Sequence, residues 1–463
     1  LRANARQVCL HLALVSLIGF VLKLVLLPEA ILAKKRAAGG GAGNGVSFLI
    51  FFGCAKSLAG LAAGVSADCL GRKRACVIGW MFGLALLPAV VLGTETSSWM
   101  AFRAADALLG VQQGLTWGLN IICLMDLLGP EGRGMASGMS NAMGYLASAA
   151  AAPPAAALAG DAYGEREICA LLGVCVFLGM GLVCISKDTA PWVRLEQRGA
   201  RNVLDLTPGL PILDMSHKPT QQSLFVSMSG CGSKAAAACA LGGLTVNAAT
   251  ALIWGPLVPW CREQGSISLP AIGFIESAHS VAKVLGMLVG GLLVDRCSPR
   301  PVAVTAMTLL VAGLGLVVSI TRGKPTEADL LMASGAVGLA VGLAFPALAV
   351  ASCNAAPTAH RAAAYGGYRM WRDFGYAAGG ILSNFWIGGA EDAGSGLRSA
   401  TLGVALLSIS AALALALALP PACGSSSSSA RESEAVQLVD ANSSWGSSSA
   451  VHGDNLWRQL PES

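Results

Sequence analysis

Apolar stretches recur along the whole chain, and each is close to the ~20 residues that a helix needs to cross the hydrocarbon core of a bilayer. Short polar segments separate them. Many stretches contain several Gly and Ala residues, which let helices approach closely in lipid. The spans expected from this pattern are residues 8–32, 45–66, 75–93, 99–125, 134–158, 168–186, 236–260, 269–294, 302–320, 328–353, 363–388 and 398–420. The sequence therefore predicts an all-α membrane protein with twelve transmembrane helices.

Composition excludes several other classes of protein. Charged residues make up 12% of the chain, whereas soluble domains average about 25%. The net charge is +5 without a dense basic block, so nucleic acid is not an expected partner. The 14 cysteines are scattered without a C-x-x-C pair, which argues against a zinc site or a disulfide framework. No catalytic or nucleotide-binding motif occurs, so we expect neither an enzyme nor a cofactor.

The polar segments divide the chain into four parts. Residues 1–186 and 236–420 each hold six spans, and residues 187–235 read as a solvated, cytoplasmic linker between them. The Ser-rich tail, residues 421–463, is expected to be disordered. The first apolar run is long enough to be a membrane span rather than a cleaved signal peptide.

The orientation in the membrane rests mainly on the linker. An even number of spans places both termini on the same side. Lys and Arg are balanced between the two sets of short loops, and the basic residues of the linker favour the cytoplasm for its side. Both termini are therefore expected to be cytoplasmic.

A short polar motif, which we call the clasp, lies between the second and third spans. It reads Gly64-x-x-x-Asp68-x-x-Gly71-Arg72-Lys73-Arg74. A related sequence follows the eighth span, with Gly291, Asp295 and Arg296 in the same order. Together with further echoes between the halves, this repeat indicates two related units of six helices.

The clasp pattern resembles the signature of the major facilitator superfamily between its second and third helices. Residues 126–134 and 368–376 are similar to a bacterial-type subgroup whose substrates are generally unassigned. That subgroup has an acidic residue in the fifth span where this chain has Asn141. The resemblance implies the major facilitator fold, two pseudo-symmetric halves, transport by alternating access and a monomer.

Two interpretations of the clasp remain open. Gly64 and Gly71 would permit close helix contact and a sharp turn, and Asp68 would face the N-terminus of a helix. Arg72 and Lys73 would pair with carboxylates or helix C-termini of neighbouring helices. The clasp is then a gate that holds one side closed. The alternative is an ordinary loop whose charges only set the topology.

Two lysines occupy equivalent positions in the halves. Lys56 lies twelve residues before Asp68, and Lys283 lies twelve before Asp295. The helical rise places both about 18 Å into the membrane, where a charge is costly unless it faces a partner or a cavity. A basic pair facing a central cavity would favour an anionic substrate. The alternatives are snorkelling and a structural salt bridge. His279, four residues before Lys283, is expected at the membrane interface, and a pH-dependent role is the alternative.

The eleventh span carries the densest charge inside the membrane. Arg369 and Asp373 are four residues apart and can pair on one helix face, with Arg372 beside them. Asp373 is our candidate for a protonatable coupling acid, and the arginines are candidate substrate contacts. The alternative is a buried structural ion pair. Weaker candidates for substrate or coupling roles are Lys23, Arg103, Asp106, Asn247 and Trp254, of which Arg103 and Asp106 could simply form a local ion pair.

The function expected from these patterns is secondary active transport of a small solute, with proton coupling and an anionic substrate. The expected partners are that solute, protons and the lipid bilayer. Two other functions remain open. One is a multidrug or metabolite exporter with an apolar cavity, and the other is a receptor or sensor on the same fold that does not transport.

Overall fold

The structure is a computed structural model. It describes residues 4–36, 44–158, 164–193, 196, 233–257, 260, 269–323, 325–356, 360–388 and 393–421. Most of the expected linker and nearly all of the expected tail lie outside these residues, so the interpretations of both remain predictions.

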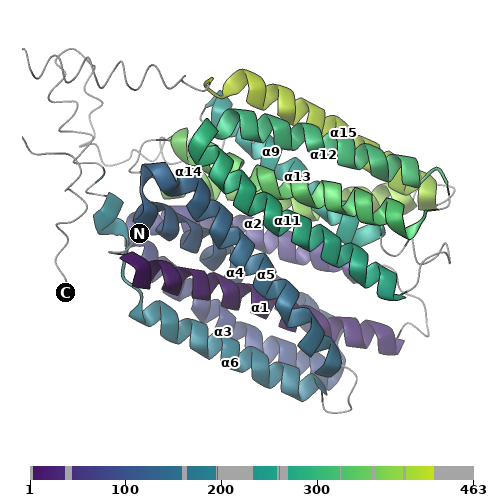
Figure 1. The fold of residues 1–463 in the computed structure, drawn as a ribbon. Helices are drawn as coiled ribbons and strands as arrows, with labels where there is room; N and C mark the ends of the chain where they lie inside the picture. Colours follow the sequence, from purple (N-terminus) through teal and green to yellow (C-terminus); the bar gives the residue numbers. More distant parts are fainter. Residues whose placement is uncertain are drawn as a thin grey trace, which may run out of the picture.

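The described chain is almost entirely helical and forms two bundles that lie side by side (Figure 1). The N-terminal bundle is coloured purple to teal, and the C-terminal bundle teal to yellow. The helices of the first are α1 (Ala5–Arg36), α2 (Asn44–Leu70), α3 (Arg72–Thr96), α4 (Trp99–Leu128), α5 (Arg133–Leu158) and α6 (Gly164–Ile185). Those of the second are α9 (Lys234–Leu252), which continues as the π-helix η4 (Ile253–Leu257), α11 (Leu269–Cys297), α12 (Pro299–Ile320), α13 (Glu327–Asn354), α14 (Arg361–Gly388) and α15 (Ala393–Ala418).

Each expected span coincides with one of these helices, and most helices extend a few residues further. Over the described residues, 10 helices are long and apolar enough to cross a membrane. α5 and α14 are the two that fall outside that set. α14 is the helix that carries the buried charges Arg369, Arg372 and Asp373.

Local signals explain where several helices begin and end. The Ser98 hydroxyl accepts a hydrogen bond from the backbone N–H of Ala101 at the start of α4, which is an ordinary N-cap. At α13, Thr326 and Asp329 form a reciprocal capping box. Between α2 and α3, Gly71 has φ of 95°, a conformation that glycine adopts at little cost.

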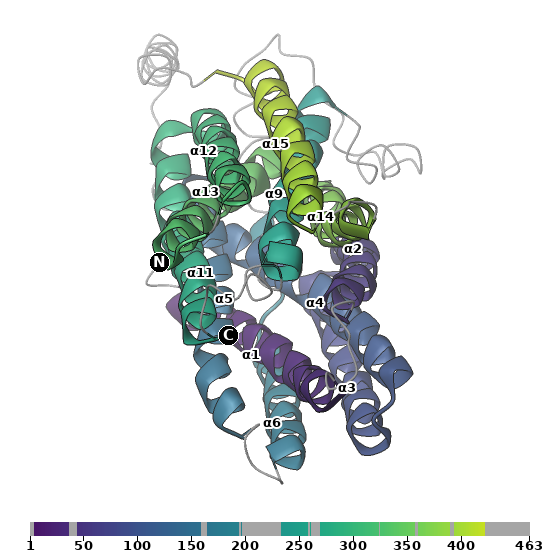
Figure 2. The same ribbon diagram turned by 90° about the vertical axis from the view of Figure 1, so that its right-hand side faces the viewer.

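The two bundles meet along two helix pairs, α2 with α14 and α5 with α11, as Figures 1 and 2 also show. Behind these pairs lie α4 and α13, most of whose residues are buried. Inter-helix packing of this kind in lipid depends on small residues.

The halves also repeat each other in how they hold the two lysines. A Cβ on Gly114 of α4 would lie 2.6 Å from the carbonyl oxygen of Lys56 on α2. In the other half, a Cβ on Gly342 of α13 would overlap the carbonyl oxygen of Lys283 on α11. Only glycine allows either approach. In each half, the helix that carries the lysine therefore packs closely against its neighbour at the lysine's own backbone. The two halves therefore share the same helix–helix contact at equivalent positions of the internal repeat.

Candidate functional site

Five charged side chains gather between the two halves, and we call them the central cluster: Lys56, Lys283, Arg369, Arg372 and Asp373. All five are buried, with Lys56 5% exposed and Asp373 0% exposed. They come from α2, α11 and α14, so both halves contribute. Four basic groups therefore surround one carboxylate. A surplus of buried basic groups in a membrane protein marks a solute or ion pathway.

Asp373 is held by both arginines. Its Oδ2 accepts hydrogen bonds from Nε and Nη2 of Arg369 at 3.0 and 2.6 Å. Its Oδ1 accepts from Nε and Nη2 of Arg372 at 3.0 and 2.8 Å. The Asn247 amide adds a longer contact of 3.4 Å to Oδ1. The carboxylate thus serves as the shared counter-ion of two guanidinium groups, which is the structural ion pair considered as an alternative.

Each arginine keeps one nitrogen outside this ion pair. Nη1 of Arg369 and Nη1 of Arg372 are buried, and neither has a hydrogen-bond partner among the described residues. A buried donor without a partner carries a free-energy cost of about 1–3 kcal/mol. The two Nη1 atoms are therefore available to a ligand that brings hydrogen-bond acceptors.

Aromatic rings surround the lysine amines. Lys56 Nζ donates to the amide oxygen of Gln113 at 2.9 Å. It lies 4.7 Å from the ring centre of Phe52, 5.3 Å from that of Trp117 and 5.7 Å from that of Tyr376. Contacts of this type stabilise an amine by cation–π attraction when it is protonated.

Lys283 has the same kind of surroundings. Its Nζ lies 3.9 Å from the ring centre of Tyr145 and 4.9 Å from that of Phe345. Both lysines thus lie within the protein and do not extend to the membrane surface, so the snorkelling alternative does not describe them. The structure brings the lysine pair together with the arginines.

A small cavity lies beside Lys56. Its volume is about 20 Å³, which is room for roughly one water molecule. Lys56, Trp117, Tyr145 and Tyr376 line it, with apolar residues of α1 and α2 around them. A metabolite does not fit this space, so the structure shows the two halves closed around the central cluster.

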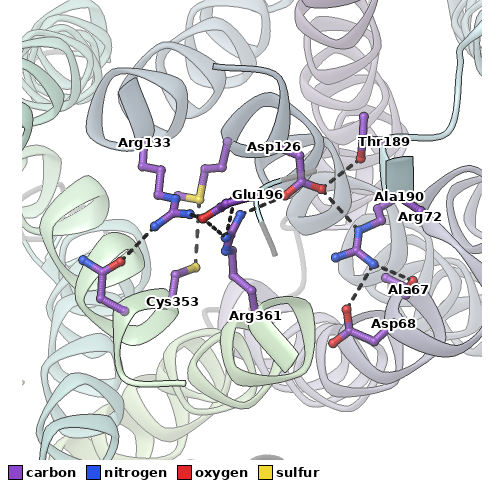
Figure 3. Close-up of polar contacts among 12 residues, drawn as sticks. Ala67, Asp68, Arg72, Asp126, Arg133, Thr189, Ala190, Glu196, Cys353 and Arg361 are labelled. Carbon is purple, nitrogen blue, oxygen red and sulfur yellow. Dashed lines mark hydrogen bonds and ion pairs between the residues drawn. The ribbon is translucent and has the colours of Figure 1, made fainter. Parts of the chain in front are cut away.

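A second polar network closes one end of the bundle, which we call the clasp face, where α2 ends and α14 begins (Figure 3). Asp68 Oδ2 accepts a hydrogen bond of 2.8 Å from the backbone N–H of Ala363, in the first turn of α14. Arg72 pairs with Asp68 at 3.1 Å and with Asp126 on α4 at 3.3 Å. The clasp therefore joins the N-terminal half to a helix N-terminus of the other half.

Arg361 extends this network across the halves. It pairs with Asp126 at 3.1 Å and donates to both carboxylate oxygens of Glu196 at 2.7 Å. Glu196 also binds Arg133 at the start of α5. Burial raises the pKa of Glu196, but the hydrogen bonds and charges of Arg361 and Arg133 outweigh it and hold this pKa below its usual value.

Lys73 of the clasp and Asp295 of the related sequence each contact another helix. Lys73 Nζ donates to the carbonyl oxygen of Cys184 near the C-terminus of α6, where a cation is favoured. In the other half, Asp295 accepts hydrogen bonds from the backbone N–H groups of Gly134 and Met135 at 2.6 and 2.8 Å. Asp295 therefore caps α5 as Asp68 caps α14, and both contacts cross between the halves.

The C-terminal half matches the family model of the Major Facilitator Superfamily over residues 239–460. This match places the C-terminal half in the major facilitator superfamily. A solved structure of the major facilitator superfamily proton:xylose symporter XylE, bound to 6-bromo-6-deoxy-D-glucose, matches with a TM-score of 0.66 and 13% identity. The match covers 89% of this chain and 95% of that one. No curated protein sequence matches the chain.

The family match of the C-terminal half and the shared fold together indicate the general function. The protein is a multi-pass membrane protein and a secondary transporter, not an enzyme. The central cluster lies between the two halves, where transporters built from repeats bind their solutes. The clasp lies at one end of the same interface.

The other predicted residues lie elsewhere. Arg103 and Asp106 pair with each other within α4 at 2.7 Å, as the local alternative proposed. Lys23 is half-buried on α1, and the side chain of Trp254 lies outside the described residues. The expected position of His279 at the membrane interface stays a prediction. This side chain is 0% exposed, and its Nδ1 lies 3.1 Å from the carbonyl oxygen of Ser334 on α13.

Sequence reasoning missed several members of the two networks. Gln113 was only one of many polar residues in the spans, and Glu196 had no signal in the linker. Arg133 and Arg361 stood at echoed positions in the repeat. That repetition was the available signal that both belong to the clasp face.

Proposed function

We propose that the protein carries a small anionic solute across the membrane by alternating access, in a cycle coupled to protons. The observation that carries the proposal is the central cluster, in which four buried basic side chains surround one carboxylate. Two guanidinium nitrogens there lack partners among the described residues. An anion would satisfy both the charge surplus and these donors.

The contacts between the halves support alternating access. The central cluster is enclosed, and the clasp closes one end of the interface through Asp68, Arg361 and Glu196. Opening that end would break these contacts between polar side chains, whereas the helices themselves would stay intact. In this proposal the clasp face is cytoplasmic, as are both termini, because the linker is rich in Lys and Arg.

Proton coupling is proposed because the cluster contains ionisable groups inside the membrane. The structural relative XylE is described as a proton symporter, and at 13% identity it shares the fold alone. Its sugar ligand is not carried over here, because the central cluster of this chain is strongly basic.

The test is a flux measurement in liposomes that contain the purified protein. Radiolabelled lactate, succinate and inorganic phosphate would be supplied with and without an inward proton gradient. Tetraphenylphosphonium would serve as a lipophilic cation. We expect at least one anion to accumulate with the gradient and the cation to be excluded.

Two results would contradict the proposal. Transport of tetraphenylphosphonium without transport of any anion would favour the exporter with an apolar cavity. Saturable binding of an anion without flux would favour a sensor.

A further inference from the structure

We infer that Lys56, and not Asp373, takes up the coupled proton, and that the anionic solute supplies the counter-charge that keeps the proton there. The inference rests on the proposed function of anion transport. It assigns to the lysine of the N-terminal half a role different from that of its counterpart in the C-terminal half. It follows from the hydrogen bonds of the central cluster and from the position of the small cavity.

Asp373 is poorly arranged to accept a proton. Its two oxygens accept four hydrogen bonds from guanidinium N–H groups of Arg369 and Arg372, at 2.6–3.0 Å. Arginine remains protonated in proteins. Protonation of Asp373 would therefore leave two buried guanidinium charges without their counter-ion, which is among the more costly changes that a buried ion pair can undergo.

Lys56, in contrast to Asp373, is hydrogen-bonded to a neutral group and can gain or lose a proton. Among the described residues, its amine donates a hydrogen bond of 2.9 Å to the neutral amide oxygen of Gln113. A lysine amine, unlike a guanidinium, readily exists without its extra proton when it is buried. Since Arg369 and Arg372 already exceed the charge of Asp373, an ammonium at Lys56 would add to an uncompensated positive charge.

The groups that act on Lys56 come from each helix around it. Asp373 is the one carboxylate among the described residues that interacts with it electrostatically, and it is shared with two arginines. The full set is Phe52 on its own helix, Gln113 and Trp117 on α4, Arg369, Arg372, Asp373 and Tyr376 on α14, and Lys283 on α11. The balance of fixed charge around the amine is therefore positive until an anion arrives.

The cavity distinguishes Lys56 from Lys283. Lys56 lines the water-sized cavity of about 20 Å³, together with Trp117, Tyr145 and Tyr376. Lys283 is not among the residues that line it, and its amine is covered by the rings of Tyr145 and Phe345. A proton that enters through water therefore reaches Lys56 first.

The coupled step is balanced in atoms and charge. A proton from water adds to the lone pair of Lys56 Nζ, while the anion binds to Nη1 of Arg369 and Arg372. When the halves reopen on the other side, the anion leaves and the ammonium returns its proton to water. One proton and one anion cross together, so transport of a monoanion moves no net charge.

The test compares two measurements on each variant in liposomes, with lactate, succinate and inorganic phosphate as probes. Accumulation driven by a proton gradient reports coupling, and exchange of labelled for unlabelled probe reports solute movement without net proton flow. K56R keeps a fixed positive charge, and K56M keeps the approximate length without a charge. In both we expect the accumulation ratio to fall to about one while measurable exchange persists.

Two further lysine variants complete the comparison. K283R should still respond to the proton gradient, and K234R, at the exposed start of α9, should match the wild type in both measurements. Gradient-driven accumulation by K56R and K56M would overturn the inference while leaving anion transport in place. If the wild type moves none of the probes in either measurement, the proposed function fails as well.

A measurement on the wild-type protein makes the outcome independent of variant folding. The ¹⁵Nζ resonances of labelled lysine distinguish a neutral amine from an ammonium, and the resonance missing from K56R assigns Lys56. We expect a neutral amine without anion and an ammonium with a transported probe present. An ammonium in both conditions would overturn the inference.

Discussion

The hydroxyl groups of Tyr145 on α5 and Tyr376 on α14 lie 3.3 Å apart and form a hydrogen bond between the two halves. Both rings line the cavity beside Lys56. Tyr145 also covers the amine of Lys283, and Tyr376 lies near that of Lys56. The tyrosine pair therefore connects both lysines to a contact that must break if the halves separate at this level.

Removal of one hydroxyl should loosen this contact. In Tyr376→Phe the hydrogen bond to Tyr145 is lost, which is a change of about 1 kcal/mol or roughly fivefold in the open population. Hydrogen–deuterium exchange should become faster in the first turns of α2, around Phe48 and Phe52. Tyr365→Phe is the matched control, because the Tyr365 hydroxyl has no hydrogen-bond partner among the described residues. Equal exchange in the two variants would argue against a gating contact.

Truncation of either central lysine should impair transport. Lys56→Ala and Lys283→Ala each remove a buried basic group from the central cluster. An interaction with a charged group contributes about 1.5–3 kcal/mol, so transport driven by a proton gradient should fall at least tenfold. Flux in liposomes at equal protein content measures this, with Lys234→Ala as control. Normal transport by both cluster variants would show that the lysines have no role in it.

A methyl group at Gly64 should destabilise the closed clasp face. A Cβ there would overlap the carbonyl oxygen of Ala362 on α14, and overpacking of this kind costs about 1–3 kcal/mol. Cys353 is a natural reporter, because it is buried and its Sγ lies 3.9 Å from Met125 Sδ in the other half. Reaction of Cys353 with a maleimide, followed by mass spectrometry, should accelerate in Gly64→Ala.

The control for this variant is Gly173→Ala on α6, where a Cβ would have no neighbour within 4 Å. Cys239, which is buried inside the C-terminal half, serves as the internal reference. If Cys353 and Cys239 accelerate together, Gly64→Ala loosens the whole protein and not the clasp face.

The contribution of Glu196 should depend on pH. Its pKa in the folded protein is lowered from the usual 4.5, because the hydrogen bonds and charges of Arg361 and Arg133 outweigh the effect of burial. A lowered pKa means that the carboxylate stabilises the fold fully above its unfolded-state pKa, and that this is lost as the pH falls through the lowered value.

Thermal unfolding of the wild type and of Glu196→Gln measures this contribution. At neutral pH the variant should be less stable by about 1–2 kcal/mol, because Arg361 and Arg133 lose a charged acceptor. The difference should shrink as the pH is lowered below about 4. A difference that is independent of pH would show that the carboxylate charge is not what stabilises the wild type.

The equivalent positions of the two lysines in the halves were predictable, but their partners were not. Lys56 and Lys283 lie twelve residues before equivalent acidic residues, and a regular helical rise is enough to place them within the membrane. The hydrogen bond from Lys56 to Gln113 joins residues 57 positions apart. That pairing depends on how α2 lies against α4, which Gly114 decides through its contact with the Lys56 carbonyl oxygen.

The charged residues of α14 were likewise predictable in part. The four-residue spacing of Arg369 and Asp373 predicts their pairing, because such residues share one helix face. The inclusion of Arg372, with all four hydrogen bonds directed at one carboxylate, was not predictable. It makes Asp373 the shared counter-ion of two arginines, and for this reason we propose Lys56 as the coupling group in place of Asp373.

By itself, the sequence determined the helices, the two related halves and which charged residues lie within the apolar spans. Apolar run length, helical spacing and the internal repeat are local or periodic properties, so they do not require knowledge of packing. The tertiary structure decided which charges meet. Asp126, Glu196 and Arg361 are distant along the chain and come together only because α4, the linker and α14 converge at the clasp face. Tyr145 and Tyr376 likewise meet only because α5 and α14 face one another across the interface between the halves.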